Sequence, residues 1–276
     1  MLYTRFYDQV LTEINAGKVH EGINQLVGML DVVGLGSGSL AQAKRELRGH
    51  SLCQMLLEDP SVAAAEARPN EPDARVRMIG GTAPSDDISS TGRRLFEVTS
   101  DLTFARALRQ RRESFDLRLS NAWRQGQKIC VLASDGCSLV RQLRGADSSN
   151  ITIIDIEEAS DAICLAAQTS PFFDLILAPD LLDRDATPAL SEILRPMAAC
   201  LGAHGSIVVA ALMPQHLGAG WRSACLNWDP YCHDEGALAK LAASAGLTAR
   251  TYRDETDCIV WCELKVPPRA HDKGAI

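Results

Sequence analysis

Carboxylates in the second half of the chain stand directly after short apolar runs. Asp155 follows the run 151–154, and Asp180 and Asp183 follow the run 173–178. Apolar runs of this length are typical of buried strands in parallel sheets. An acidic residue at the carboxyl end of such a strand can accept hydrogen bonds from the hydroxyl groups of a ribose. The pattern therefore predicts a site for a ribose-containing cofactor at one edge of a sheet, with Asp155 as the ribose ligand.

The turn after the run 129–132 is the second place where a cofactor would touch the chain. It reads Ala133, Ser134, Asp135, Gly136, with one glycine where two or three are usual. Gly136 still permits a tight turn. Asp135 adds a negative charge, which lowers affinity for a ligand that carries its own carboxylate. Two interpretations stay open, a cofactor-binding turn and an ordinary connection from strand to helix.

Strands and helices alternate from Lys128 onward. A helix is expected from Leu190 to Leu201, ended by Gly202 and His204-Gly205, between two apolar runs. Strand, helix and apolar strand in this order predict a parallel βαβ unit. The last two strands are close enough in sequence to form an antiparallel hairpin. The expected strands are 129–134, 152–156, 174–178, 206–211, 249–255 and 258–265.

The first part of the chain is helical in pattern, with no convincing strand. The expected helices are Tyr3–Asn15, Val19–Val33, Leu40–Glu58 and Leu102–Arg124. The glycines at 34, 36 and 38 follow a helical pattern and not a strand, so we interpret them as a linker and not as a nucleotide motif. The predicted domains are a helical region (1–125, with a Pro/Gly-rich loop or linker at 67–94), an α/β domain (126–266) and a flexible tail (267–276).

Composition excludes several classes of function. The chain has 276 residues, a net charge of −7 and a pI near 5.4, which argues against nucleic acid as a partner. Its nine cysteines are scattered without a C-x-x-C pair, so we expect reduced thiols in a cytoplasmic protein and no metal site. No apolar run is long enough for a membrane span.

The segment 172–214 resembles class I S-adenosylmethionine (SAM) methyltransferases between their fourth and fifth strands. The chain from Tyr7 to Leu264 resembles, more narrowly, the bacterial family associated with 3-hydroxypalmitic acid methyl ester biosynthesis. The matching segments, in the order of that family, are His50-Ser51-Leu52 with Glu58-Asp59-Pro60, the arginine-rich 106–112, Phe173–Asp183, and Asn227-Trp228 followed by Tyr231–Asp234.

This resemblance implies a class I methyltransferase-like (Rossmann-like) α/β fold. A mainly parallel sheet with an antiparallel terminal hairpin would follow a helical N-terminal region. It implies SAM as the cofactor and a small-molecule acid or acyl (fatty-acid-like) acceptor. The implied cofactor-binding residues are Ala133, Ser134, Asp135, Gly136, Asp155, Ala178 and Asp180. Those expected to line the acceptor pocket are Asp183, His216, Trp228, Tyr231 and His233. Arg109, Arg111 and Arg112 either meet an anionic substrate or form a solvated helix face.

Departures from the family leave an alternative open. Residues 68–74 keep only part of the family's signature sequence, and the turn after the first strand has one glycine where two or three are usual. The segment 156–172 is too short to hold a helix, a strand and a second helix, because a parallel crossover alone takes a dozen or more residues. Together they predict that SAM binds weakly, with a dissociation constant moved from micromolar toward millimolar, or not at all. The alternative is a catalytically inactive relative that acts as a binding partner or scaffold, in a homodimer or with a paralogue. A nicotinamide dehydrogenase is disfavoured because no G-x-G-x-x-G follows a strand.

Overall fold

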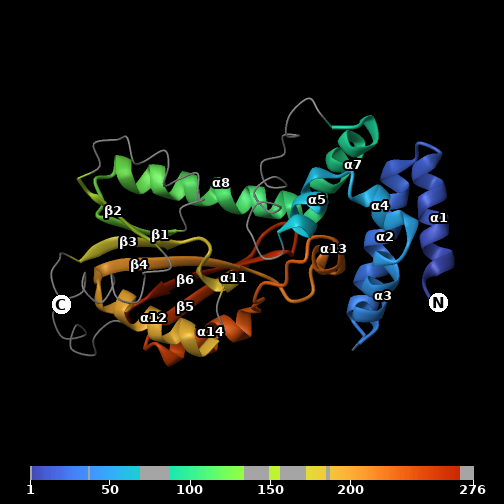
Figure 1. Ribbon diagram of the computed structural model, residues 1–276. Coiled ribbons are helices and arrows are strands. Elements are labelled where there is room, and N and C mark those ends of the chain that lie inside the picture. Colours follow the sequence, from blue (N-terminus) through green and yellow to red (C-terminus); the bar gives the residue numbers. More distant parts are fainter. Residues whose placement is uncertain are drawn as a thin grey trace. The chain divides into compact units, whose positions relative to one another are not determined.

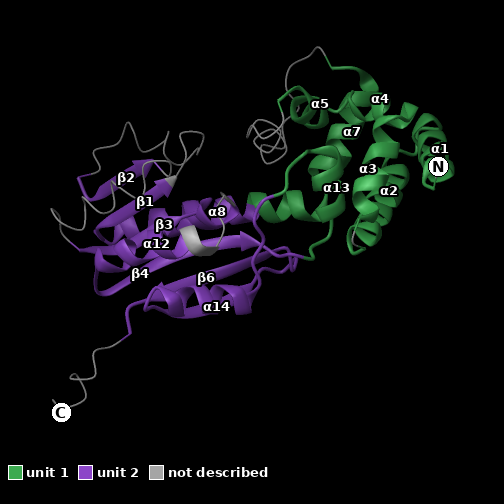
Figure 2. Cartoon of the chain, turned by 60° about the horizontal axis from the view of Figure 1, so that its bottom comes forward, with its two compact units in different colours: residues 1–109, 215–229 green, residues 110–214, 230–276 purple. Residues whose placement is uncertain are grey.

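The chain forms two compact units, each built from two separate stretches of sequence. The computed structural model describes residues 2–36, 38–68, 88–133, 149–155, 172–184 and 187–267. One unit comprises Met1–Arg109 with Gln215–Asp229, and the other comprises Gln110–Pro214 with Pro230–Ile276 (Figure 2). The division falls inside helix α8 (Thr103–Arg124) and not at the predicted 125/126. Among the described residues, no helix is both long and apolar enough to cross a membrane.

The described parts of the first unit contain helices and their connections and no strand, as predicted. Its helices are α1 (Thr4–Asn15), α2 (Val19–Gly34), α3 (Ser39–Arg48), α4 (Ser51–Leu56), α5 (Pro60–Ala67), α7 (Ser90–Ser100), the start of α8, and α13 (Ala219–Cys225). The predicted single helix Leu40–Glu58 is wrong, because it breaks at Gly49-His50. The His50 ring accepts a hydrogen bond from the amide of Leu52 at 3.0 Å and so caps α4. The linker interpretation of the glycines is confirmed, since Gly34 ends α2 and Gly38, with a φ of +84°, precedes α3. Part of the predicted loop 67–94 is also helical, because α7 begins at Ser90; residues 69–87 lie outside the described part.

Helix α13 comes from the second half of the sequence but packs against α2. The Asp31 carboxylate accepts hydrogen bonds from the amides of Gly218 and Gly220 at 2.7 and 2.8 Å, and so holds the start of α13. A β-carbon at Gly220 would lie 2.3 Å from the backbone carbon and oxygen of Leu30, so only glycine allows this approach. The indole of Trp221 is fully buried in this unit. The segment 215–229 therefore belongs to the helical unit and not to the predicted α/β domain 126–266.

The second unit is built on a six-stranded sheet. Its strands are β1 (Ile129–Ala133), β2 (Ile151–Asp155), β3 (Phe173–Ala178), β4 (Leu201–Leu212), β5 (Thr248–Arg253) and β6 (Ile259–Lys265), in the order β2-β1-β3-β4-β6-β5 (Figure 1). Strands β1 to β4 are parallel to one another, whereas β6 is antiparallel to both β4 and β5. The predicted α/β fold, with a mainly parallel sheet and an antiparallel terminal hairpin, is confirmed.

Strand β4 begins earlier than predicted. Gly202 and His204-Gly205, expected to end the preceding helix, lie within the strand, and α12 ends at Ala199. A register shift between β3 and β4 accommodates this start. A β-carbon at Gly205 would lie 2.6 Å from the carbonyl oxygen of Phe173, so this glycine lets the two strands approach. The glycines therefore serve strand pairing here and not helix termination.

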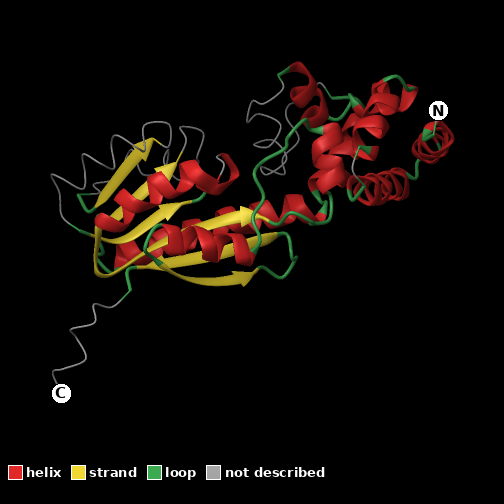
Figure 3. Ribbon diagram, turned by 90° about the horizontal axis from the view of Figure 1, so that it is seen from below, coloured by secondary structure: helices red, strands yellow, loops and turns green. Residues whose placement is uncertain are grey.

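Helices cover both faces of the sheet. The second part of α8 lies on one face, and α12 (Thr187–Ala199) and α14 (Glu235–Ser244) lie on the other (Figures 1 and 3). On the α8 face, the ring centroids of Phe115 and Trp261 are 5.0 Å apart. On the opposite face, the core is mostly aliphatic and includes Leu190, Leu194 and Leu238. The two layers leave the ends of the strands as the places where polar groups can gather.

Candidate functional site

The carboxyl ends of β1, β2 and β3 meet at one edge of the sheet. Ala133, the last residue of β1, is the register partner of Asp155, the last residue of β2. On the other side of β1, Val131 pairs with Leu177, so Ala178 ends β3 at the same edge. The chain passes from β1 outward to β2 and then returns to β3, which makes the space between β1 and β3 a topological switch point. Ligands of open α/β sheets bind outside the strand ends at such points.

Four of the predicted cofactor-binding residues gather at this edge. Ala133, Asp155, Ala178 and Asp180 end or directly follow the three adjacent strands. The remaining three, Ser134, Asp135 and Gly136, lie outside the described residues. The sheet thus joins positions that the sequence separates by more than forty residues.

A buried ion pair stands next to this edge. Asp183 lies in the short helix α11 (Leu181–Arg184), and both its carboxylate oxygens accept hydrogen bonds from the Arg111 guanidinium, at 2.8 and 3.3 Å. The side chains are 1% and 5% exposed. The same Arg111 nitrogen lies 3.6 Å from an oxygen of Asp180, whose side chain is 20% exposed. Asp183 therefore acts as an ion-pair partner, and Asp180 is the carboxylate that reaches solvent.

Both predictions for the arginine run, contact with an anionic substrate or a solvated helix face, are wrong for Arg111. Its side chain is buried and is therefore neither solvated nor open to a substrate. Burial alone would lower the pKa of its guanidinium, but the charges of Asp183 and Asp180 outweigh burial and raise that pKa. Arg112 is exposed, and Arg109 donates to the carbonyl oxygen of Ser100 at 2.6 Å. A signal for the burial was present in the sequence. Arg111 lies on one stripe of α8 with the buried side chains of Phe104, Leu108, Phe115 and Leu119, and a buried cation needs a partner.

Two further candidates, Tyr231 and His233, lie beside the ion pair. The amide of Tyr231 donates to the carbonyl oxygen of Asp183 at 3.2 Å, and the Tyr231 residue is 50% exposed. His233 is buried, and its Nε2 lies 3.2 Å from the carbonyl oxygen of Leu182. Because a carbonyl oxygen can only accept, Nε2 carries the proton in this bond. Burial lowers the pKa of His233 despite that bond and the nearby charges of Asp183 and Asp234. The structure thus brings three of the five predicted acceptor-pocket residues together, with Tyr231 as their exposed member.

The other two, His216 and Trp228, belong to the helical unit. The His216 ring packs against Phe104, with the ring centroids 6.0 Å apart. The Arg222 guanidinium lies 5.4 Å from the centroid of the Trp228 ring and donates to the Trp228 carbonyl oxygen at 2.7 Å. Both rings therefore have packing roles within that unit, and their place in an acceptor pocket stays a prediction.

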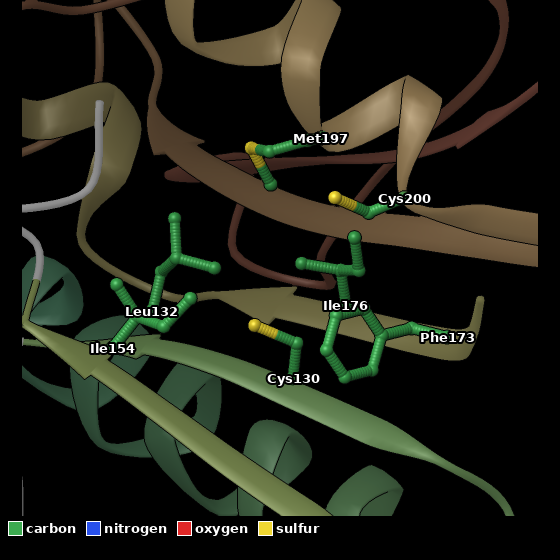
Figure 4. A pocket seen from close by; sticks show the side chains of 7 residues that line it. All are labelled: Cys130, Leu132, Ile154, Phe173, Ile176, Met197 and Cys200. Atoms are coloured by element: carbon green, nitrogen blue, oxygen red, sulfur yellow. The ribbon is translucent and has the colours of Figure 1, made fainter. Parts of the chain in front are cut away.

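The sheet beneath the strand ends is apolar on its α12 face. Cys130, Ile176, Met197 and Cys200 point toward one another there, together with Leu132, Ile154 and Phe173 (Figure 4). No water-sized space remains between them. Burial, with a smaller effect from Cys200, raises the pKa of the Cys130 thiol to about 12. These sulfur atoms are core groups, because all three side chains are buried. The Cys130 thiol, with its raised pKa, forms little thiolate at neutral pH.

The described site is suited to binding and orientation. Within the described ranges, no three His, Cys, Asp or Glu side chains stand where they could hold a metal ion. Asp155 ends β2, Asp180 follows β3 with a side chain that is 20% exposed, and Tyr231 is half exposed. Carboxylates can accept hydrogen bonds from a polar or cationic ligand.

Comparisons with known proteins add a likeness of fold. No protein-family model and no curated protein matches the chain. A solved structure described as a possible exported protein from Bordetella parapertussis is similar with a TM-score of 0.50 and 17% identity, over 83% of this chain and 95% of that one. The structure of magnesium protoporphyrin IX methyltransferase from Synechocystis PCC 6803 with bound S-adenosylhomocysteine (SAH) has a TM-score of 0.42 and 14% sequence identity, over 74% of this chain and 98% of that one. The structure of mitomycin 7-O-methyltransferase has a TM-score of 0.43 and 16% sequence identity, over 77% of this chain and 74% of that one. At 17% identity, the likeness to the Bordetella parapertussis protein concerns the fold alone.

Proposed function

We propose that this chain is a SAM-dependent methyltransferase that acts on a small-molecule acid or acyl acceptor. The observation that carries the proposal is the meeting of Ala133, Asp155 and Asp180 at the switch point of the sheet. The resemblance of 172–214 to class I methyltransferases agrees with this placement, because it concerns the strand and loop that contribute Ala178 and Asp180.

The residues at the edge suit the parts of SAM. Asp155 would accept hydrogen bonds from the ribose hydroxyls, and the backbone at Ala133 would face the methionine moiety. The partly exposed carboxylate of Asp180 suits a cationic or hydrogen-bond-donating part of the cofactor.

When bound, SAM supplies an electrophilic methyl group with a good leaving group. The chain's own residues then have to align the acceptor and exclude water. An acceptor carboxylate is already anionic and needs no general base. This fits a site in which His233 is buried and bonded to a carbonyl oxygen and Asp183 is bonded to Arg111. The half-exposed ring of Tyr231 offers an apolar surface to an acyl chain.

The experiment is transfer of a tritium-labelled methyl group from SAM to a panel of aliphatic and 3-hydroxy carboxylic acids of increasing chain length. We expect an organic-extractable, base-labile methyl ester, and we expect its rate to fall in Asp155→Ala. As a matched control, Asp174→Ala removes a carboxylate from the amino-terminal end of β3, away from the predicted site. The absence of ester for every acid, together with retained binding of SAM, would refute the acceptor class and leave the cofactor assignment standing. The inactive alternative predicts neither ester nor binding.

A further inference from the structure

We propose that Arg111 is a positioning residue, which holds the Asp180 carboxylate at the switch point for the cofactor; the inference rests on the proposed function. Arg111 lies far from Asp180 and Asp183 in sequence, and all three belong to the same unit. One of its guanidinium nitrogens lies 2.8 Å from Asp183 and 3.6 Å from Asp180. The Arg111 guanidinium therefore forms ion-pair contacts with two carboxylates.

The three side chains differ in their exposure, and this difference assigns their roles. Arg111 and Asp183 are 5% and 1% exposed, so neither can reach a ligand in solution. Asp180 is 20% exposed. Asp183 fixes the guanidinium with two hydrogen bonds, and the guanidinium in turn restrains Asp180. Asp180 is the only one of the three that can meet the cofactor directly.

Electrostatics make the position of Asp180 depend on Arg111. Asp180 and Asp183 are close in sequence and share one cation. Without that cation their charges would repel, and one of them would take up a proton or turn toward solvent. Arginine suits this task because its planar group presents several donors at fixed angles, whereas lysine carries a compact point charge. An ion-pair network that restrains a carboxylate before the cofactor binds lowers the entropic cost of binding.

A positioning role has to be separated from a purely structural one. Removing Arg111 alone would leave Asp183 buried without a partner and would destabilise the fold. The double variant Arg111→Met with Asp183→Leu removes the whole pair, and apolar replacements of buried ion pairs are often neutral or stabilising. Asp180 keeps its carboxylate in this variant but loses its restraint. Asp180→Asn is the companion variant that removes the charge of Asp180 directly.

The experiment is a calorimetric titration of SAH into four full-length proteins: the wild type, the double variant, Asp180→Asn, and the triple variant that combines all three substitutions. Thermal unfolding of each protein is measured alongside. We expect the double variant to unfold within a few degrees of the wild type and its dissociation constant to rise about 10- to 100-fold. Asp180→Asn should weaken binding to a similar extent, and the triple variant should be no weaker than the double variant. Wild-type affinity in the folded double variant would overturn the inference, as would independent, additive losses in the triple variant.

Arg111→Lys supplies a second test that does not depend on the double variant folding. It keeps a buried positive charge but cannot bridge both carboxylates, so we expect weaker SAH binding by a protein that is still folded at the assay temperature, although its unfolding temperature falls. Wild-type binding by Arg111→Lys would show that charge alone suffices and would overturn the bridging role. Failure of the wild type itself to bind SAH would overturn the proposed function, and the inference with it.

Discussion

Replacement of Gly220 by alanine should detach α13 from α2. The added β-carbon would lie 2.3 Å from the backbone of Leu30, whereas non-bonded carbon atoms normally rest about 3.5–4.0 Å apart. Backbone cannot rotate away as a side chain does, so α13 would have to move by roughly 1 Å or more. That movement would lengthen the hydrogen bonds that Asp31 now accepts at 2.7 and 2.8 Å. Overpacking costs about 1–3 kcal/mol, and weakening bonds to a charged acceptor adds to it. We expect a loss of about 3 kcal/mol in the free energy of unfolding.

The assay is denaturant-induced unfolding followed by far-ultraviolet circular dichroism. Gly28→Ala is the matched control, because Gly28 lies in α2 with an open site where the β-carbon would go. This control should stabilise the protein by up to about 1 kcal/mol, since alanine is the better helix former. If Gly220→Ala is as stable as Gly28→Ala, then α13 does not pack on α2, and the assignment of 215–229 to the helical unit is wrong.

Three further predictions concern the proposed ribose ligand, a buried histidine and a helix cap. Asp155→Ala should weaken SAH binding by about 1–3 kcal/mol in calorimetry, the usual effect of losing hydrogen bonds to a carboxylate; unchanged affinity would remove Asp155 from the site. Burial lowers the pKa of His233 below its ordinary 6.5, so the unfolded chain takes up the proton first as pH falls. The contribution of His233 to stability is therefore complete above pH 6.5 and is lost as pH falls through the folded pKa. His233→Gln should flatten the fall in unfolding free energy below pH 6.5, and a slope equal to that of the wild type would contradict this. Asp59→Ala removes the cap of α5 at the Ser61 amide (2.7 Å) and the partner of the Thr99 hydroxyl, and should lower the unfolding free energy by about 2–4 kcal/mol; a loss below about 0.5 kcal/mol in denaturant unfolding would show that this network is not structural.

The sheet could be predicted because most of its strands are continuous apolar runs that alternate along the sequence with helical patterns. The expected strands 129–134, 152–156, 174–178 and 206–211 pair in the order β2-β1-β3-β4, which places Val131, Ile153, Ile176 and Val208 on adjacent strands. The terminal hairpin was also expected, from the closeness of its two strands in sequence. The periodicity of apolar residues and the spacing between apolar runs determine such features, so a single sequence is enough to predict them.

The errors arose where tertiary contacts override local pattern. Gly205 resembles a helix stop but lies in β4, because a neighbouring strand needs its lack of a side chain. The place of α13 in the helical unit depends on Asp31, which is remote in sequence. The charge of the arginine run favours a substrate contact or a solvated helix face, whereas the position of Arg111 on the apolar stripe of α8 places it in the interior. Its partner Asp183 is likewise too distant in sequence for any local rule to pair them.

The central claim is that the carboxyl edge formed by Ala133, Asp155 and Asp180 binds SAM. The most direct measurement is a calorimetric titration of SAH into the wild type and Asp155→Ala, carried to millimolar ligand because the reduced glycine turn predicts weakened affinity. The account predicts saturable binding with one site per chain in the wild type and a clear loss in the variant. No heat of binding at millimolar SAH, or equal affinity in both proteins, would contradict it.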